Sequence, residues 1–556
     1  MKFTSQNKQL TFELFRSSLD ELDKTNRWVM LGDLLPWAEI EKRYNSKLNN
    51  QVKGAGIKPA RLIIGAMIIK HKLNLGDEET IQMIQENPYM QYMCGLSEYT
   101  TKPVFDPSLF VTIRKRISEE ELNDITVSLL KEQRLKQEKK RKEEEGQDKG
   151  NNPEPPSPTP SNPDAQEFTD SKGRLHKGVL KIDATCANAE VRYPVDIDIV
   201  NDGLRIIEEY TTDICKQFGV RKPKTPYSSA RAVYLEVVKR KKKGGKFLKD
   251  SLGMMLAYLE KAVRMLFDIL VFNPEMNRYF TPTKKRIFSA VCTMLNQQKE
   301  MFREGVHHCA DRIVSIFQPH IRPIVRGKAK ANTEFGAKIG ASIVEGYTFV
   351  DHHSWDAYNE SSDLSLQIQL FKERFGYLPA TILADKIYMN RTNRDMLEDL
   401  EVRTYCKPLG RPPKNPPSPD VKARMAKAVG ERNEIECSFG TGKRIYRADN
   451  IRAKLPETAR CWTGMCYFVK NVMKFLRELC HALTEIRHTL LLIDSLVGII
   501  RNPLVTAKYK FSGHYLCYVS LLLRHYMRNK SMKSSLLLVV MHPQKTRLLQ
   551  QLYVLP

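Results

Sequence analysis

The spacing of apolar residues between about positions 34 and 117 predicts a run of short helices. Two apolar faces recur at helical spacing, one formed by Ile63, Met67, Ile68 and Leu73 and the other by Ile81, Ile84 and Met90. Asn87-Pro88 predicts a break after the second face. Another helix is expected after Asp106-Pro107-Ser108, where Asp or Ser can cap the free amides. We therefore expect a small all-α domain within residues 1–130.

The last of these predicted helices carries three consecutive cations, Arg114, Lys115 and Arg116. Cations on a compact helical unit suit docking on DNA, because they neutralise phosphates while the helix presents side chains to a groove. Basic residues on a helix are also commonly no more than its solvated face. Charge alone does not separate these interpretations, so the three residues are candidate DNA contacts.

Residues 131–173 combine a mixed-charge run with a stretch rich in Pro, Ser and Asn. Such a composition cannot bury enough apolar surface to fold alone. We expect a disordered linker here, which would let the N-terminal domain reach a DNA site while the next domain works elsewhere.

Beyond the linker the pattern changes to strands, at 179–183, 341–350 and 380–385, with a hairpin expected around Glu345-Gly346. Helical periodicity occupies much of the interval between the first two, over roughly 204–217, 228–271 and 286–304, with a basic tract at 239–246 at an expected helix break. The predicted fold class is α/β (α+β). It comprises a mixed sheet flanked by helices, with a helical insertion at about 204–305, all preceded by the small all-α domain.

The length and the net charge of the chain limit the number of domains and the kinds of partner that we expect. A chain of 556 residues exceeds what one hydrophobic core ordinarily organises, so two or three domains are expected. The formal charge of +25, from 89 Lys and Arg against 64 Asp and Glu, favours an anionic partner. Nucleic acid ranks first. A membrane surface ranks well below, because Lys and Arg are scattered along the chain and not gathered on one amphipathic helix.

No apolar stretch reaches the roughly 18 residues that a membrane span needs, and the N-terminus lacks the apolar core of a signal peptide. The eleven cysteines form no CxxC pair, which favours reduced thiols over a zinc module or a disulfide framework. His307-His308-Cys309 and His352-His353 also lack the ligand spacing of known zinc sites. We expect a cytoplasmic protein.

Two predicted strands end in a carboxylate, at Asp183 and Asp385, where open α/β sheets place ligands. Phosphoryl transfer at DNA needs hard cations held by oxygen ligands, so two such residues invite a third. Arg432, Glu436 and Lys443 stand at offsets of four and seven and would share one helical face. If that helix packs on the sheet, Glu436 completes a metal site while the two cations hold phosphates.

A surface ion pair between Arg432 and Glu436 is the alternative interpretation. Gly440 and Gly442 are candidates to end the helix before Lys443, which would change the position of that lysine. A phosphate-binding P-loop at Gly442-Lys443 is excluded, because Arg444 follows where Ser or Thr is required.

Several segments together resemble the DDE transposases of bacterial insertion sequences, over about residues 30–480. In the N-terminal part the resemblance rests on 77–96 and 105–117. In the catalytic part it rests on 181–186 with 192–196, on 383–388, on 408–413 and on the family's last element. That element is Tyr, two residues, Arg, three residues, Glu, six residues and Lys. Arg432, Glu436 and Lys443 fit it in register, whereas Val429 stands at the Tyr position.

The resemblance implies an RNase H-like catalytic domain, here within 174–482, after a helical DNA-binding domain. It assigns the catalytic and metal-ligand roles to Asp183, Asp385 and Glu436, with two magnesium ions, or manganese, bridged by Asp183. One ion would activate the nucleophile and the other would stabilise the leaving oxygen. Arg432 and Lys443 would offset phosphate charge on the DNA.

The expected function is therefore DNA transposition. The protein would bind the terminal inverted repeats of an element, cleave DNA and transfer strands to a double-stranded target, as at least a homodimer. Two alternatives stay open, a catalytically silent DNA-binding protein derived from a transposase and an RNase H-like nuclease. Residues 483–556 do not resemble the family and remain unassigned.

Overall fold

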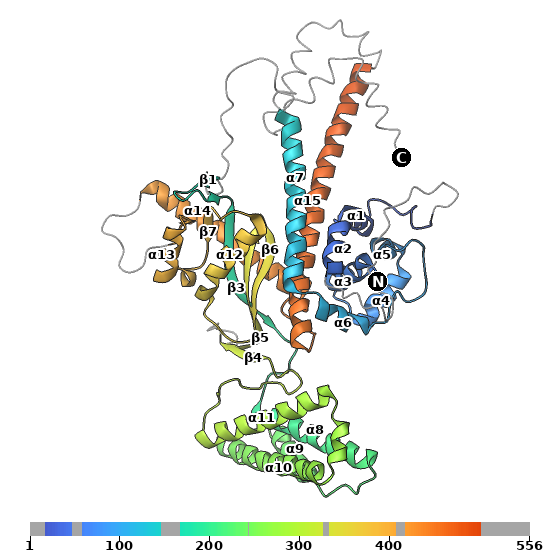
Figure 1. The fold of residues 1–556 in the computed structure, drawn as a ribbon, viewed down its shortest axis with the longest axis vertical. Coiled ribbons are helices and arrows are strands. Elements are labelled where there is room, and N and C mark those ends of the chain that lie inside the picture. The colour runs from blue at the N-terminus through green and yellow to red at the C-terminus, as the bar shows by residue number, and fades with distance from the viewer. Residues whose placement is uncertain are drawn as a thin grey trace.

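The computed structural model describes residues 17–46, 58–145, 167–242, 244–325, 333–406 and 418–501. Within these ranges, side chains are described except for residues 139–145 and 482–501. The fold is mixed α+β, with a helical N-terminal region, a curled mixed sheet and a separate group of helices at one end (Figure 1). This arrangement is consistent with an RNase H-like fold and confirms the predicted class.

The N-terminal region folds into short helices, as the apolar spacing predicted. They are α1 (Arg27–Leu34), α2 (Trp37–Ser46), α3 (Ala60–Leu73), α4 (Asp77–Glu86), α5 (Pro88–Met93) and α6 (Leu109–Arg116). The predicted break is present, because the Asn87 side chain caps α5 and Pro88 occupies its first turn. The side chain of Asp106 accepts from the amide of Ser108 at 2.9 Å just before α6.

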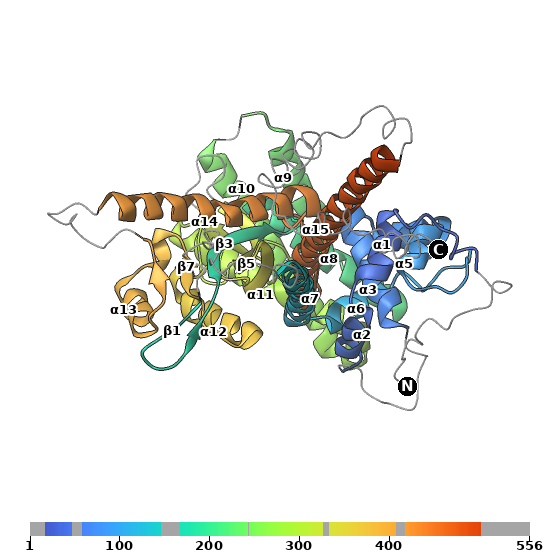
Figure 2. The ribbon, with the colours of Figure 1, turned by 90° about the horizontal axis from the view of Figure 1, so that it is seen from above.

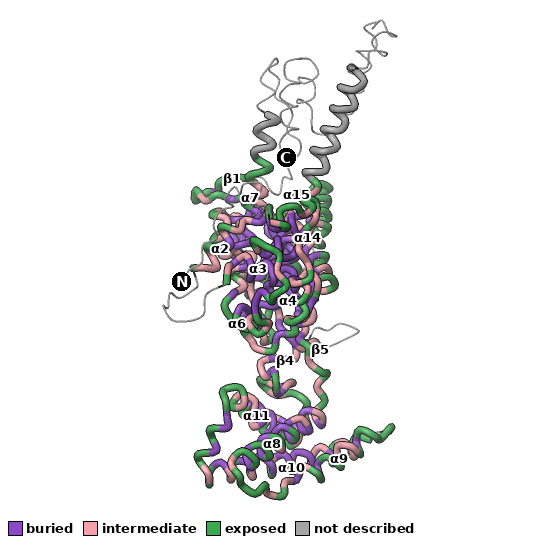
Figure 3. Tube along the Cα trace, turned by 90° about the vertical axis from the view of Figure 1, so that its right-hand side faces the viewer, coloured by how far each residue is buried: buried purple, intermediate pink, exposed green. Residues whose placement is uncertain are grey.

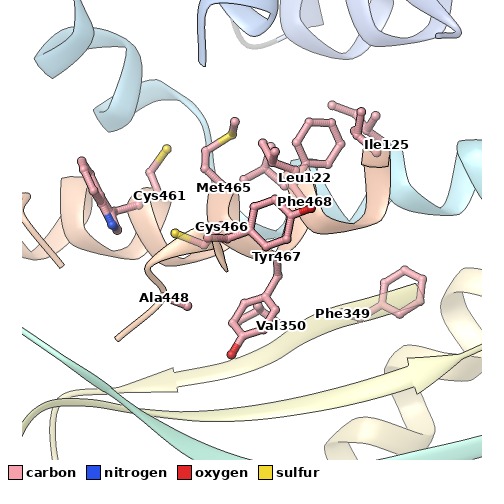
Figure 4. Close-up of a cluster of buried hydrophobic side chains, with 14 of the residues drawn as sticks. Leu122, Ile125, Phe349, Val350, Ala448, Cys461, Met465, Cys466, Tyr467 and Phe468 are labelled. Carbon is pink, nitrogen blue, oxygen red and sulfur yellow. The ribbon is translucent and has the colours of Figure 1, made fainter. Parts of the chain in front are cut away.

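Two long helices, α7 (Glu119–Glu145) and α15 (Pro456–Arg501), lie side by side between the N-terminal helices and the sheet (Figures 1 and 2). Leu122 and Ile125 of α7 pack with Tyr467 and Phe468 of α15 over Val350 of the sheet (Figure 4). The N-terminal helices and the sheet thus share one continuous core (Figure 3).

The linker expected from residue 131 begins differently in the structure. Residues 131–145 continue α7, because Leu129 and Leu130 are fully buried in the shared core and the helix follows α15 from there. Residues 146–166 lie outside the described part of the chain, and residues 168–176 form the hairpin of β1 (Phe168–Thr169) and β2 (Leu175–His176). The composition identified a polar segment, but it could not show that residues 131–145 would continue a helix that packs on α15.

The main sheet has the order β4-β5-β3-β7-β8, with β6 paired to β5. Its strands are β3 (Val179–Asn188), β4 (Arg322–Val325), β5 (Thr333–Val344), β6 (Tyr347–Ser354), β7 (Thr381–Leu383) and β8 (Arg403–Thr404). β3 pairs antiparallel with β5 and parallel with β7. The predicted hairpin is confirmed, because Glu345 and Gly346 both have positive φ between β5 and β6, as a two-residue turn requires.

The helical insertion is present between β3 and β4. It consists of α8 (Asp196–Gln217), α9 (Tyr227–Lys239), α10 (Gly245–Phe272), the 3-10 turn η3 (Pro274–Tyr279) and α11 (Pro282–Glu304). These elements have a hydrophobic core of their own and lie at the far end of the molecule from the free ends of α7 and α15 (Figures 1 and 3). The basic tract falls between α9 and α10, at the predicted helix break.

Two helices cover opposite faces of the sheet. α14 (Pro419–Tyr446) lies on one face and α12 (Asp363–Phe375) on the other (Figure 2). Three short elements, η4 (Glu360–Ser362), η5 (Lys386–Tyr388) and α13 (Arg391–Asp399), lie near the ends of the strands. Among the described residues, no helix is both long and apolar enough to cross a bilayer.

Candidate active site

Asp183 lies within β3, and Asp385 lies just beyond the end of the neighbouring strand β7. β3 and β7 are parallel neighbours, and their register pairs Lys181 with Leu383. β7 ends at Leu383, and Asp385 follows it by two residues, close enough to Asp183 for its charge to raise the pKa of that aspartate. Neighbouring strands are about 4.8 Å apart, so the two carboxylates can serve one site.

Asp183 is the more enclosed of the two aspartates. Its side chain is 16% exposed, and its Oδ1 accepts from the amide of Ala184 at 2.8 Å. Burial raises the pKa of Asp183 to about 6, and the nearby charges of Glu360 and Asp385 act in the same direction, whereas Arg432 opposes them. Asp385 is exposed, with its side chain accepting from the amide of Lys386 at 2.6 Å.

Arg432 of α14 joins the first candidate carboxylate to the third. Its Nη1 lies 3.6 Å from Asp183 Oδ2, and its Nη2 donates to Glu436 Oε1 at 3.0 Å. The guanidinium is 19% exposed, whereas the side chain of Glu436 is 56% exposed. The predicted surface ion pair therefore exists, but the same arginine also reaches the sheet.

Lys443 lies on the same helix, which runs unbroken to Tyr446. The two glycines considered as a helix end do not end it. A side chain at Gly442 would meet the ring of Tyr467 at 2.7 Å, so this glycine allows α14 to pack closely on α15. Seven residues of helix separate Lys443 from Glu436 by about 10 Å, so Lys443 lies further along a surface that begins at the carboxylates.

An open pocket of about 670 Å³ lies beside Asp385, between β7 and α14. Arg432 lines it, and so does Val429, which stands at the family's Tyr position. Val429 thus places an apolar side chain in the pocket that Asp385 and Arg432 also line, where the family has the hydroxyl-bearing ring of a tyrosine.

The cations of α6 have two different environments. Arg114 is buried, and its Nη1 and Nη2 donate to Asp77 at 2.9 and 2.7 Å. Its assignment as a DNA contact is therefore wrong, because an internal carboxylate already occupies both of these groups. Lys115 and Arg116 are exposed and remain candidates.

Sequence reasoning missed Glu360, whose charge raises the pKa of Asp183. Glu360 is paired with Lys338 at 2.9 Å. Tyr388 is fully buried close to these acids, and its hydroxyl has no hydrogen-bond partner among the described residues. No motif flags Glu360, since it follows a strand at no recognisable spacing, and only the fold brings it near Asp183.

Within the described residues, no group of three or more His, Cys, Asp or Glu side chains is arranged to hold a metal ion. The donor chemistry of the two aspartates nevertheless fits a hard divalent cation. Acidic neighbours raise the pKa of Asp183, and a cation would relieve the repulsion between them. Glu436 is held by Arg432 in this structure and, being exposed, has room to turn.

Comparisons with known proteins find two families, and both are described as transposase domains. A family described as "Transposase domain (DUF772)" matches residues 16–116, and one described as "Transposase DDE domain" matches residues 382–473. The protein named "Uncharacterized protein ORF8 in nfe locus" from Rhizobium meliloti is 30% identical over 114 residues. That match covers 20% of this chain and 54% of the relative, so the chain spans about half the length of the curated relative it matches. No solved structure matches.

The first family match covers the N-terminal helices up to Arg116, and the second covers Asp385, Arg432, Glu436 and the whole of α14. Both support a transposase function in general. Two separate matches, in the order helical domain and then DDE domain, support a DDE transposase of insertion sequences.

Proposed function

We propose that the protein is a transposase that binds the ends of an insertion sequence and catalyses metal-dependent DNA cleavage and strand transfer. The observation that carries the proposal is the proximity of Asp183 on β3 to Asp385, just beyond the parallel neighbour β7, with Arg432 linking Asp183 to Glu436. Phosphoryl transfer with divalent ions needs this combination of oxygen ligands and a nearby cation.

In this proposal Asp183, Asp385 and Glu436 hold two divalent ions, magnesium or manganese, which when bound supply activation of the nucleophile and stabilisation of the leaving oxygen. Asp183 must be ionised to act as a ligand, and Arg432 favours its ionised form. Release of Glu436 from Arg432 would free the guanidinium for a DNA phosphate. Lys443 would contact the same strand further along α14.

The DNA partners proposed are the terminal inverted repeats and the target duplex. Lys115 and Arg116 of α6 would contribute phosphate contacts outside the catalytic centre. Because two element ends must be held together, we propose that a homodimer acts on DNA in the bacterial cytoplasm. We further propose that residues 1–130 bind DNA and that residues 174–482, which include the helical insertion, carry out catalysis.

The test is cleavage and joining of DNA that carries the sequences flanking the gene, with magnesium or with a chelator. The intact protein is compared with Asp183→Asn and Glu436→Gln. Asp268→Asn on the exposed surface of α10 is the matched control.

Loss of both reactions in the two site variants, with DNA binding retained and Asp268→Asn active, would support the proposal. Tight binding without any reaction by the intact protein would instead favour a catalytically silent DNA-binding protein. Cleavage without joining would favour the nuclease.

A further inference from the structure

A run of cations lies on the helical insertion, where α9 ends and α10 begins. Residues 239–249 contain seven Lys or Arg and no Asp or Glu, and we call this segment the basic turn. Its described cations are all exposed, and they are Lys239, Arg240, Lys241, Lys242, Lys246 and Lys249. The basic turn thus lies on different elements from the cations of α6 and from the candidate active site.

Packing within the insertion brings the two ends of the basic turn together. α9 and α10 pack against each other, so the cations at the end of one helix lie beside those at the start of the next. The guanidinium of Arg240 lies 4.1 Å from the centre of the Phe247 ring, which joins the end of α9 to the first turn of α10. Phe247 and Leu248 in turn pack against the core of the insertion. The cations therefore form one surface.

The cations of the basic turn lack the counter-charges that other cations of the insertion have. Lys222 pairs with Glu208, and Lys299 pairs with Glu260. In contrast, no carboxylate among the described residues forms an ion pair with a cation of the basic turn. Cations held close together without counter-charges repel one another, and an anionic partner would relieve this repulsion.

The start of α10 adds to the positive potential. This helix is 28 residues long, its N-cap residue Gly244 offers no side-chain cap, and its first turn contains no acidic residue. The first turn contains Lys246 instead, although the free amides of a helix N-terminus carry partial positive charge and favour acidic side chains. The same amides bind phosphates well. The arrangement is thus unfavourable alone and favourable beside a phosphate.

The apolar residues of the basic turn favour a nucleic acid over a membrane as the partner. A membrane-binding surface combines its cations with apolar side chains that point outward. Phe247 and Leu248, the two large apolar residues of the segment, pack instead on the core of the insertion. Exposed lysines suffice for a DNA backbone, because its phosphates require cations and no apolar contact.

We propose that the basic turn binds the phosphate backbone of double-stranded DNA independently of base sequence, as a contact separate from α6 and from the candidate active site. This inference rests on the proposed function, which supplies the DNA. Lysine ammonium groups and helix amides contact phosphate oxygens and do not read base edges from there. The contact should therefore be the same on any duplex.

The test measures binding of two fluorescent duplexes of equal length, one with the flanking sequence and one unrelated, to the full chain without divalent metal at several salt concentrations. We expect Lys241→Gln combined with Lys242→Gln to weaken binding of both duplexes about 5- to 20-fold and to reduce the salt dependence by about two phosphate contacts. Lys261→Gln combined with Arg264→Gln removes the same charge from exposed positions of α10 and should bind as the intact protein does.

Unchanged affinity and salt dependence in the Lys241 and Lys242 double variant would overturn the proposal. A loss confined to the flanking duplex would also overturn it, since the contact would then depend on sequence. Vesicles of phosphatidylglycerol and phosphatidylcholine supply the second arm. Vesicle binding that is lost in this variant while DNA binding stays unchanged would assign the basic turn to a membrane surface and overturn the proposal.

The two duplexes also separate this inference from the proposed function. An equal loss on both duplexes, in a protein that neither prefers nor cleaves the flanking DNA, would support the basic turn as a DNA contact and contradict the proposed function. Absence of binding to either duplex by the intact protein would contradict both.

Discussion

Arg432 Nη1 lies 3.6 Å from Asp183 Oδ2, although 249 positions separate the two residues (432 − 183). The contact fixes α14 against β3 at the place where β7 delivers Asp385. It also balances the acidic surroundings that raise the pKa of Asp183. This arginine is thus both a structural link and an electrostatic part of the candidate site.

Replacing Arg432 should impair the reaction more than it impairs folding. Arg432→Lys cannot reach Asp183 and Glu436 together, so we expect cleavage to fall about 10- to 100-fold, the range seen when partners of metal ligands are altered. Single-turnover cleavage on flanking DNA measures this. Lys427→Gln, on the exposed surface of the same helix, is the control, and equal rates for the two variants would contradict the role of Arg432.

Arg114 should matter for stability and not for DNA contact. Arg114→Met leaves Asp77 with one fewer cation in a mostly buried cluster, and we expect a loss of about 3 to 5 kcal/mol in the free energy of unfolding. Urea denaturation measures the change. Lys115→Met, one residue along on the exposed face, should stay within about 0.5 kcal/mol of the intact protein. An unchanged unfolding midpoint in Arg114→Met would show that the pair is not structural.

The exposed cations of α6 should contribute to DNA affinity. Lys115→Gln and Arg116→Gln are each expected to weaken binding uniformly across sequences and to lower the salt dependence by about one contact. Fluorescence anisotropy at several salt concentrations measures both effects. Arg264→Gln, exposed on α10, provides the comparison, and identical behaviour of all three variants would remove α6 from the DNA-binding surface.

Glu119 at the start of α7 should make stability depend on pH. Burial raises its pKa to about 8, and its Oε1 is buried without a hydrogen-bond partner in the described structure. The folded state therefore keeps a proton that the unfolded state loses near its ordinary pKa, so stability falls as the pH rises from about 4.5 to about 8.

Glu119→Gln removes this loss, and we expect it to exceed the intact protein in stability by roughly 1 to 3 kcal/mol at pH 8 to 9 and to match it near pH 4. Urea denaturation across pH measures the difference. Glu120→Gln, its exposed neighbour, should keep the pH dependence of the intact protein. If Glu119→Gln showed the same pH dependence of stability as Glu120→Gln, Glu119 would not be the group that causes it.

An apolar run followed by Asp is a local pattern, and it correctly indicated the strands that lead to Asp183 and Asp385. The predicted strand ends were wrong, because β3 continues through Asp183 to Asn188 by pairing with β5, and β7 ends at Leu383, two residues before Asp385. The helical insertion and the hairpin at Glu345-Gly346 were local as well, and both are confirmed. The spacing from Arg432 to Glu436 correctly indicated a contact, since helical geometry alone brings these side chains together.

Contacts between distant segments could not be predicted in this way. The burial of Arg114 depends on Asp77, and the course of α7 beyond residue 131 depends on α15. Likewise, the link from Arg432 to Asp183 and the proximity of Glu360 arise only when α14 and η4 pack beside β3. The family's 408–413 segment lies outside the described residues, and so do residues 502–556, whereas α15 continues through the start of the unassigned extension to Arg501.

The central claim is that Asp183 acts through a bound divalent ion, and replacement of its carboxylate by a thiolate tests this most directly. Asp183→Cys should be inactive on flanking DNA with magnesium, which binds sulfur poorly, and should regain cleavage with manganese, a softer ion. Asp183→Ala should stay inactive with both metals. Equal activity of Asp183→Cys and the intact protein in magnesium would contradict a metal-ligand role for Asp183.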